Sequence, residues 1–165
     1  MDTLTQPLRD EHKELIPHIE NILRVADSIP DMPLEQIQDG VEEVYDFLAY
    51  HLLPHAQAEE AALYPAVQQA LGSPNATRTM SHDHIEVGRY IEELAVLRRE
   101  ISPRQFKPLL RVLYGVYALV KVHFAKEEEV YLPILEDRLS TEQAKELFEA
   151  MEKAAGEAKL ALHTN

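Results

Sequence analysis

Two short segments of this chain carry the same pair of side chains at the same spacing. Glu59 lies four residues after His55, and Glu127 lies four residues after His123. Residues four apart share one face of an α-helix, about one turn from each other. Two such helices that face each other would bring two imidazoles and two carboxylates into one interior space. This set of ligands suits a pair of metal ions.

Apolar residues recur every three or four positions along most of the chain, which predicts helices. Glycine is scarce, with 5 residues, and alanine, leucine and glutamate are abundant. The expected helices cover about 5–28, 34–71 and 75–100, followed by a fourth that starts at Ser102 and a fifth that starts at Ser140. Four long helices with short joins predict an all-α, up-down-up-down four-helix bundle over residues 1–136. We expect residues 137–165 to form an additional C-terminal amphipathic helix and tail, packed on the same domain.

Local signals mark the ends of these helices. Gly72 is a typical helix stop, and residues 102–105 (SPRQ) and 140–143 (STEQ) both fit the capping-box pattern of a helix start. Pro54 lies inside the second predicted helix, directly before His55. It either bends the helix and tilts that side chain, or only curves a long helix around the core.

Composition excludes several classes of site and partner. The chain has no cysteine, which excludes disulfides, thiolate metal sites and a cysteine nucleophile. Its formal charge of -13 indicates a protein that is repelled by nucleic acid and by anionic lipid. The N-terminus does not resemble a signal peptide, and no uncharged apolar run is long enough to span a membrane. We therefore expect a cytoplasmic protein, a monomer or a dimer, with no nucleic-acid or membrane partner.

Six polar side chains fall on the otherwise apolar stripes of the four long helices. A lone histidine on such a stripe is usually a hydrogen-bonded core residue, but four histidines on four stripes form a pattern. Burying two carboxylates without a counter-charge costs several kcal/mol each, and the stripes offer few lysines or arginines. Bound metal ions would supply the missing positive charge. The predicted metal ligands are His12, His55, Glu59, His84, His123 and Glu127.

Residues beside this set have more than one interpretation. His51 lies one turn before His55. It is a further metal ligand, a residue that contacts a ligand from outside the metal site, or a residue at the edge of the site. Glu60 and Glu128 point away from the stripe on an ideal helix, as solvated charges or as acceptors that orient a histidine, with Glu128 also a substitute ligand. Tyr131 is either a core tyrosine or a phenol near the metals. We expect His18 and His82 on the surface.

Nitrogen and oxygen ligands without thiolate fit iron, manganese or zinc. Structural zinc sites are usually tetrahedral and rich in cysteine, which makes zinc the weaker candidate. An open coordination position on a redox metal is where dioxygen, peroxide or nitric oxide would bind.

The order of these motifs resembles the hemerythrin-like, or HHE cation-binding, domain. The resemblance covers about residues 8–136 and leaves the fifth helix outside. Its motifs are Glu11-His12, the HxxxEE segment from His55, Asp83-His84 and the HxxxEE segment from His123.

This resemblance implies a four-helix bundle with a non-haem di-iron centre, in which two iron ions share an oxo or hydroxo bridge. His12 and His55 would hold one iron, His84 and His123 would hold the other, and both would be bridged by the carboxylates of Glu59 and Glu127.

Two positions depart from the pattern of the oxygen-carrying hemerythrins. Those proteins have a second histidine one turn after the residue matching His84, where this chain has Gly88. They also place an aspartate five residues after the last histidine ligand, whereas Glu127 is four residues after His123. The second iron would thus need water, Tyr131, His51 or Glu128 as a further ligand. Other branches of the family resemble this chain better, including bacterial proteins linked to peroxide, nitric oxide or iron responses.

Three functions remain open from the sequence. The first is a di-iron protein that reacts with or senses peroxide, dioxygen or nitric oxide, with a catalase-like or peroxidase-like activity in oxidative stress. The second is an iron or oxygen sensor in which metal occupancy controls partner contacts through the fifth helix. The third is a helical bundle whose histidines and glutamates do no chemistry.

Overall fold

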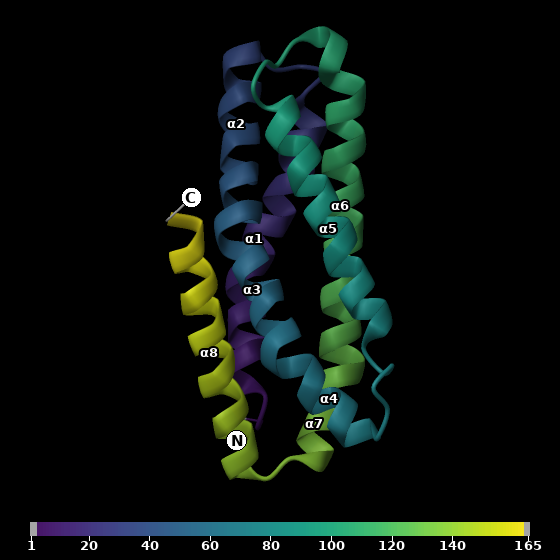
Figure 1. The fold of residues 1–165 in the computed structure, drawn as a ribbon. Helices are drawn as coiled ribbons and strands as arrows, with labels where there is room; N and C mark the ends of the chain where they lie inside the picture. Colours follow the sequence, from purple (N-terminus) through teal and green to yellow (C-terminus); the bar gives the residue numbers. More distant parts are fainter. Residues whose placement is uncertain (1–2, 164–165) are drawn as a thin grey trace.

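The computed structural model describes residues 3–163 of the chain, with side chains up to residue 162. Within these residues the fold is all-α, and no strand is present. Four helical rods stand side by side, and a further helix lies along the outside of one half of the bundle (Figure 1). The predicted four-helix bundle with an additional C-terminal helix is confirmed.

The rods are long because two of them continue through irregular turns. The first and third rods are the single helices α1 (Gln6–Ser28) and α5 (Arg78–Leu97). The second rod joins α2 (Leu34–Phe47), the π-helical turn η1 (Leu48–Leu52), α3 (Leu53–Ala58), the π-helical turn η2 (Glu59–Leu63) and α4 (Tyr64–Leu71). The fourth rod joins a 3₁₀ turn η3 (Pro103–Gln105), α6 (Phe106–Lys126), the π-helical turn η4 (Glu127–Tyr131) and α7 (Leu132–Arg138). The outer helix is α8 (Thr141–His163).

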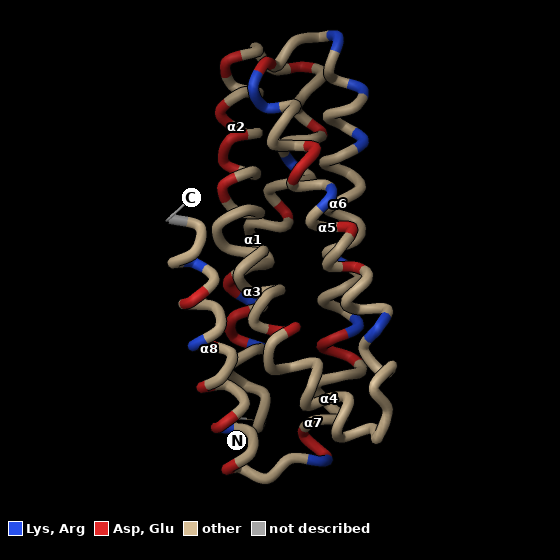
Figure 2. The backbone as a smooth tube through the Cα atoms, in the orientation of Figure 1, with Lys and Arg blue, Asp and Glu red and all other residues tan. Residues whose placement is uncertain are grey.

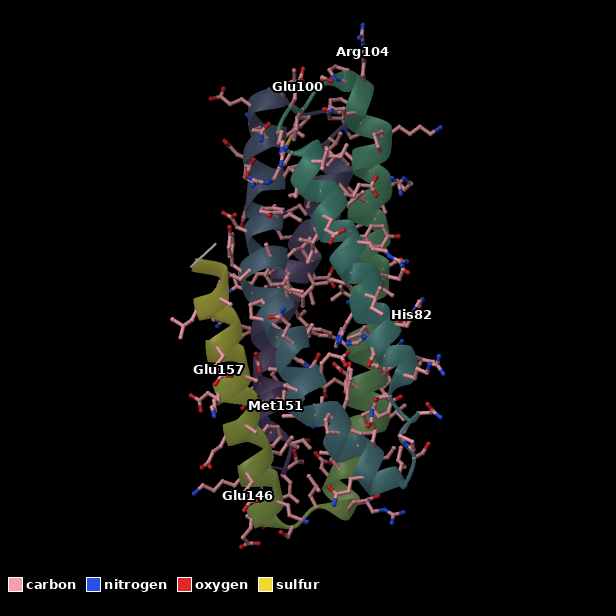
Figure 3. The ribbon with its side chains drawn as sticks, in the orientation of Figure 1. His82, Glu100, Arg104, Glu146, Met151 and Glu157 are labelled. Carbon is pink, nitrogen blue, oxygen red and sulfur yellow. The ribbon has the colours of Figure 1, made fainter. Side chains whose placement is uncertain are left out.

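The rods pack in a ring. Helix α1 packs against α2 and α6, and α5 packs against the same two helices from the other side. Helix α8 packs against α3 and η2, with Met151 on the side of α8 that faces the bundle (Figure 3). The outer helix therefore covers the segment of the second rod that carries the first HxxxE motif.

Two apolar clusters fill the interior and leave a layer between them. The larger cluster includes Ile19 of the first rod, Leu52 of the second, Val87 of the third and Val120 of the fourth. The smaller cluster takes one residue or more from the same rods and from α8, among them Leu8, Ala58, Met80, Leu132 and Leu147. On the first three rods a predicted histidine ligand lies in sequence between its residues in the two clusters, and on the fourth rod His123 directly precedes Phe124, the last residue of that rod in the larger cluster. The bundle thus brings all four histidines to one level.

Helix ends follow the predicted signals with one exception. Gly72 adopts a left-handed conformation (φ 63°) at the end of α4, which a residue with a Cβ adopts at a cost. The capping box before α8 forms, because Ser140 N donates to Gln143 Oε1 at 2.9 Å and Gln143 N donates to Ser140 Oγ at 3.2 Å. The predicted capping box at Ser102 is wrong, since this end starts with a 3₁₀ turn in which Gln105 N donates to the backbone oxygen of Ser102.

One continuous helical stretch, Pro103–Arg138, contains an 18-residue window with a mean hydropathy of 1.2 and is by length and composition able to cross a membrane. Core helices meet the same criteria, so this observation is weak evidence of a membrane segment. Here the stretch packs against α1 and α5 and carries His123 and Glu127 into the interior.

Candidate metal centre

The six predicted ligands converge on one buried space. His12, His55 and His123 are buried, His84 is partly buried with 11% of its side chain exposed, and Glu59 and Glu127 are 0% exposed. Four of the potential ligand atoms, one each from His12, His55, Glu59 and Glu127, lie within 4.8 Å of one another. A second group, from Glu59, His84 and His123, meets the same limit. The two groups share Glu59 and form a double site.

Each carboxylate offers one oxygen to each half of this double site. Glu59 Oε1 lies 3.0 Å from His55 Nε2, and Glu59 Oε2 lies 3.2 Å from His84 Nε2. Glu127 Oε2 lies 3.5 Å from His12 Nε2, and Glu127 Oε1 lies 3.4 Å from His123 Nε2. Two carboxylates between two pairs of imidazoles form the arrangement expected of bridging ligands.

A ring of acidic side chains holds the outer nitrogen of all four imidazoles. In each case Nδ1 lies within hydrogen-bond distance of a carboxylate on a neighbouring rod, which directs Nε2 inward, where it would be the atom that binds a metal. The pairs are His12–Glu128 (2.7 Å), His55–Glu11 (3.0 Å), His84–Glu60 (2.8 Å) and His123–Asp83 (3.1 Å). This favours the interpretation of Glu60 and Glu128 as acceptors that orient a histidine. Glu128 is also held by Arg9 and belongs to neither of the two groups of potential ligand atoms.

Glu11 and Asp83 directly precede His12 and His84 in the sequence motifs, which by themselves predict no role for these two acids. Adjacent residues point about 100° apart on a helix, so a ligand directed inward places its neighbour toward the next rod. The acidic residue beside each ligand was therefore the signal that could have identified these acceptors.

The buried carboxylates of Glu59 and Glu127 carry negative charge. Within the described residues, only imidazoles lie close enough to neutralise it. Both oxygens of Glu59, one of Glu127 and the Nε2 atoms of His12 and His55 are buried without a hydrogen-bond partner. Among residues 3–163, no lysine or arginine lies within ion-pair distance of Glu59 or Glu127. Buried polar atoms that lack a partner are costly. The donor set fits two cations with nitrogen and oxygen ligands.

The pKa values of the buried histidines and of Glu59 reflect the same excess of negative charge. Burial alone would lower the pKa of His55, but the Glu59 charge and the hydrogen bond to Glu11 raise it well above its ordinary value. His123 behaves alike, since Glu127 and Glu59 outweigh burial and raise its pKa to about 10. Burial would raise the pKa of Glu59, but the surrounding histidines lower it well below its usual range. Without metal, protonated imidazoles are thus the counter-charge of the carboxylates.

The structure adds Tyr64 to the site, a residue that the sequence analysis missed. Its hydroxyl donates to Glu127 Oε1 at 3.0 Å and lies 3.3 Å from Nε2 of both His84 and His123. Its ring stacks on His84 with centroids 5.3 Å apart. Burial and the nearby Glu59 charge raise the pKa of the phenol. Tyr64 therefore presents its hydroxyl oxygen to the half of the double site that contains His84 and His123.

The π-helical turn η2 explains why Tyr64 was missed. Tyr64 follows Glu59 by five residues, which an α-helix would place well away from the Glu59 face. A π-helical turn accommodates one additional residue and brings the fifth residue back toward that face. Each of the π-helical turns η1, η2 and η4 ends two residues before a proline, namely Pro54, Pro65 or Pro133. Because proline lacks an N–H, it cannot continue the α-helical hydrogen bonds, which favours the wider turn at these points.

Other candidates lie outside the site. Tyr131 donates its hydroxyl to the backbone oxygen of Ala76 at 3.0 Å, as a core tyrosine would. His51 is exposed, because η1 changes the helical register and directs Leu52 inward instead. His82 is exposed on the outer side of α5 (Figure 3), and exposed His18 stacks on Phe47.

Comparison with known proteins agrees with this geometry. A family model described as the hemerythrin HHE cation binding domain matches residues 3–135. The chain belongs to this hemerythrin HHE family. The match ends within α7, so α8 lies beyond it. The predicted family is confirmed, and its description as a cation-binding domain agrees with the histidine and glutamate cluster as a candidate metal site.

One relative among curated proteins is a DNA nickase from Nostoc sp. (strain PCC 7120 / SAG 25.82 / UTEX 2576), 25% identical over 136 residues. The match covers 78% of this chain and 36% of the relative, so the chain spans about a third of the length of that protein. No solved structure matched the chain.

Proposed function

We propose that this hemerythrin HHE domain holds two iron ions with an oxo or hydroxo bridge and reacts with or senses small oxidants: dioxygen, peroxide or nitric oxide. The observation that supports this most strongly is the double ligand set, in which Glu59 and Glu127 each face both pairs of histidines. Six ligands with nitrogen and oxygen donors and no thiolate suit iron.

The ligands divide between two positions. His12 and His55 would hold one ion, His84 and His123 the other, and both carboxylates would bridge them. The Tyr64 hydroxyl lies on the side of His84 and His123, which is where the comparison with oxygen carriers leaves a ligand missing. Tyr64 is thus a better candidate for that position than Tyr131, His51 or Glu128.

When bound, iron ions supply electrons for the reduction of a small oxidant, and the protein residues determine what surrounds that reaction. The four acidic acceptors orient the imidazoles by holding Nδ1. Tyr64 keeps a proton on its hydroxyl oxygen, directed at Glu127 Oε1, because burial raises the pKa of the phenol. The two apolar clusters lie on either side of the polar layer that the six ligands form, and they exclude water from it.

Metal counting tests this proposal directly. Wild-type protein loaded with Fe(II) without oxygen should hold two iron ions per chain, and peroxide should then produce the absorption band of a bridged ferric pair. Oxygen evolution on adding peroxide would indicate a catalase-like activity. Glu59→Gln should lose both ions, because Glu59 belongs to both ligand groups, whereas Glu129→Gln at an exposed position should keep them. A folded wild-type protein that takes up no iron would contradict the proposal.

A sensor is the second candidate, and the packing of α8 supports it. Helix α8 lies against α3 and η2, the segment that carries His55 and Glu59. A change in metal occupancy could therefore alter how firmly α8 is held. Hydrogen exchange of the full chain with and without iron would test this, and equal protection of α8 in both states would argue against a sensor that acts through this helix.

The absence of a nucleic-acid partner remains a prediction. One relative is a DNA nickase, but that name describes a protein of which this chain covers 36%. Acidic side chains gather along α2, and both signs of charge alternate along α8 (Figure 2), in a chain with a formal charge of -13. We expect no duplex binding by fluorescence anisotropy, even at low salt where such binding is strongest. Binding, or nicking of a supercoiled plasmid without peroxide, would contradict this prediction.

A further inference from the structure

A groove of about 480 Å³ runs between α1 and α6 and ends at the metal centre. Its apolar walls include Ile16, Ile19 and Phe124. His12 also lines it, and the Nε2 atom of this ring faces Glu59 and Glu127 on the inner side. One side chain layer therefore separates the groove from the buried ligand atoms.

Phe124 forms the central part of that layer. Its ring stacks on His12 with centroids 4.3 Å apart and lies 5.7 Å from the His55 ring and 6.4 Å from the His123 ring. It is 6% exposed and is itself one of the residues that line the groove. Rotation of this one aromatic ring would connect the groove with the space among three of the four imidazoles.

The lining of the groove is rich in positive charge, although the chain as a whole is acidic. Arg9, Lys13 and Lys121 line it, against one carboxylate, Glu128, which pairs with Arg9. The other partners of these cations are Glu136, Asp10 and Glu20, which do not line the groove. An excess of one sign of charge in the lining of a cleft raises the local concentration of ions of the opposite sign.

We propose that this groove is the entrance through which small anionic ligands reach the metal centre, with Phe124 as the barrier at its inner end. The inference rests on the proposed function for the metal beyond the inner end of the groove. The anionic class of ligand comes from the cationic lining of the groove itself and differs from the neutral oxidants named above. The cationic lining counteracts the repulsion that the net charge exerts on anions, and the apolar walls and the Phe124 ring restrict entry to small molecules.

A first experiment examines the groove without any metal. The chain has no tryptophan, so Phe124→Trp introduces a single indole fluorophore at the barrier. Phe47→Trp is the matched control, since Phe47 is 5% exposed and lies outside the groove. We expect iodide to quench the indole of the Phe124→Trp variant more strongly than that of the control, and more strongly than caesium quenches the same variant. Equal quenching of the two variants by iodide, or stronger quenching of the Phe124→Trp variant by caesium, would overturn the proposal.

A second experiment measures entry into the iron-loaded protein by stopped-flow absorbance with azide. Phe124→Ala should increase the association rate constant several-fold, and Phe47→Ala should leave it unchanged. Phe124→Leu provides a milder change should the alanine variant fail to fold. Unchanged rates in both Phe124 variants would overturn the proposal and place the entrance near His84, the most exposed of the four ligands.

The two experiments separate the inference from the proposed function. A wild-type protein that binds no iron would contradict the proposed function, while the quenching experiment would still decide whether the groove admits anions. A protein that binds iron but whose Phe124→Trp variant shows no preference for the anionic quencher would overturn the inference alone.

Discussion

At the scale of single residues, the centre depends on two buried carboxylates and on the groups that face them. Glu59 and Glu127 are 0% exposed and meet imidazoles and the Tyr64 hydroxyl rather than lysine or arginine. Such a pair of buried charges is strongly destabilising unless cations or protons compensate it. Metal ions and protonated histidines are therefore alternatives for the same positions, which gives the site a measurable pH dependence.

Tyr64→Phe removes one hydroxyl and keeps the ring that stacks on His84. We expect weaker metal binding at the position of His84 and His123, and a loss of roughly 1–3 kcal/mol in the metal-free protein because Glu127 Oε1 loses its donor. Metal counts and denaturant unfolding measure the two effects. Tyr131→Phe is the matched control, since that hydroxyl donates to the Ala76 backbone and should change stability without changing the metal count.

The stability of the metal-free protein should fall as the pH rises from about 7 to 10. The folded pKa of His123 is raised to about 10, above the 6.5 expected in the unfolded chain. The stabilisation from its protonation is complete below pH 6.5 and is lost as the pH rises through 10. Thermal unfolding of chelator-treated protein measures this slope. The slope should be smaller in His123→Gln, and an unchanged slope in that variant would contradict the assignment.

At the scale of secondary-structure elements, the rods differ from ideal α-helices at the points that matter for the site. The π-helical turns η2 and η4 begin at Glu59 and Glu127 themselves. Such turns occur frequently at functional sites, because they change the direction of the side chains that follow. Most helix ends, in contrast, follow local sequence signals, with the start at Ser102 as the exception.

Gly72→Ala should destabilise the protein by about 1 kcal/mol, because a left-handed residue with a Cβ is strained. Gly156→Ala is the control. Gly156 lies within α8 with nothing within 4 Å of an added Cβ, so alanine there should stabilise by about 0.5–1 kcal/mol. Denaturant midpoints measure both changes, and equal effects at the two glycines would contradict the conformational argument.

Ser140→Ala should cost about 1 kcal/mol, because the Ser140 hydroxyl accepts from Gln143 N at the start of α8. Ser102→Ala changes the same residue in a similar tetrapeptide whose side chain forms no cap. It should have an effect within about 0.5 kcal/mol of zero. Chemical unfolding of both variants tests whether the hydrogen bond, rather than the sequence pattern, provides the stabilisation.

At the scale of the whole molecule, the centre holds together rods that are distant in sequence. The four rods meet in one polar layer between two apolar clusters, and this layer gains its counter-charge only when metal is bound or its histidines are protonated. Binding to the folded state alone stabilises that state in proportion to the logarithm of ligand concentration over dissociation constant. Metal removal should therefore weaken the whole bundle.

Chelation of iron should lower the thermal midpoint of the wild-type protein, by an amount equivalent to about 3–4 kcal/mol if free metal exceeded its dissociation constant by 100-fold to 1,000-fold. Differential scanning calorimetry before and after chelation measures this change. Glu59→Gln serves as the control, since a protein that holds no metal should show the same midpoint in both conditions. A wild-type midpoint that chelation leaves unchanged would show that metal does not stabilise the fold.

The helices, the bundle and the six side chains that converge follow from periodicity in the amino-acid sequence. Apolar residues at intervals of three and four define which face of each rod is buried, and histidine or glutamate on that face must then enter the interior. Both HxxxE segments could be assigned in this way because four residues span about one turn of any α-helix.

The surroundings of those six side chains depend instead on how the rods pack in three dimensions. The Nδ1 acceptors come from neighbouring rods, so their pairing depends on how the rods are arranged around the bundle. Tyr64 enters the site, and His51 is exposed, because π-helical turns change the register that the α-helical period predicts. The groove beside Phe124 likewise exists only where α1 and α6 meet. The helical period gives the direction in which each side chain points within one rod. The distances between side chains on different rods depend on how the rods pack.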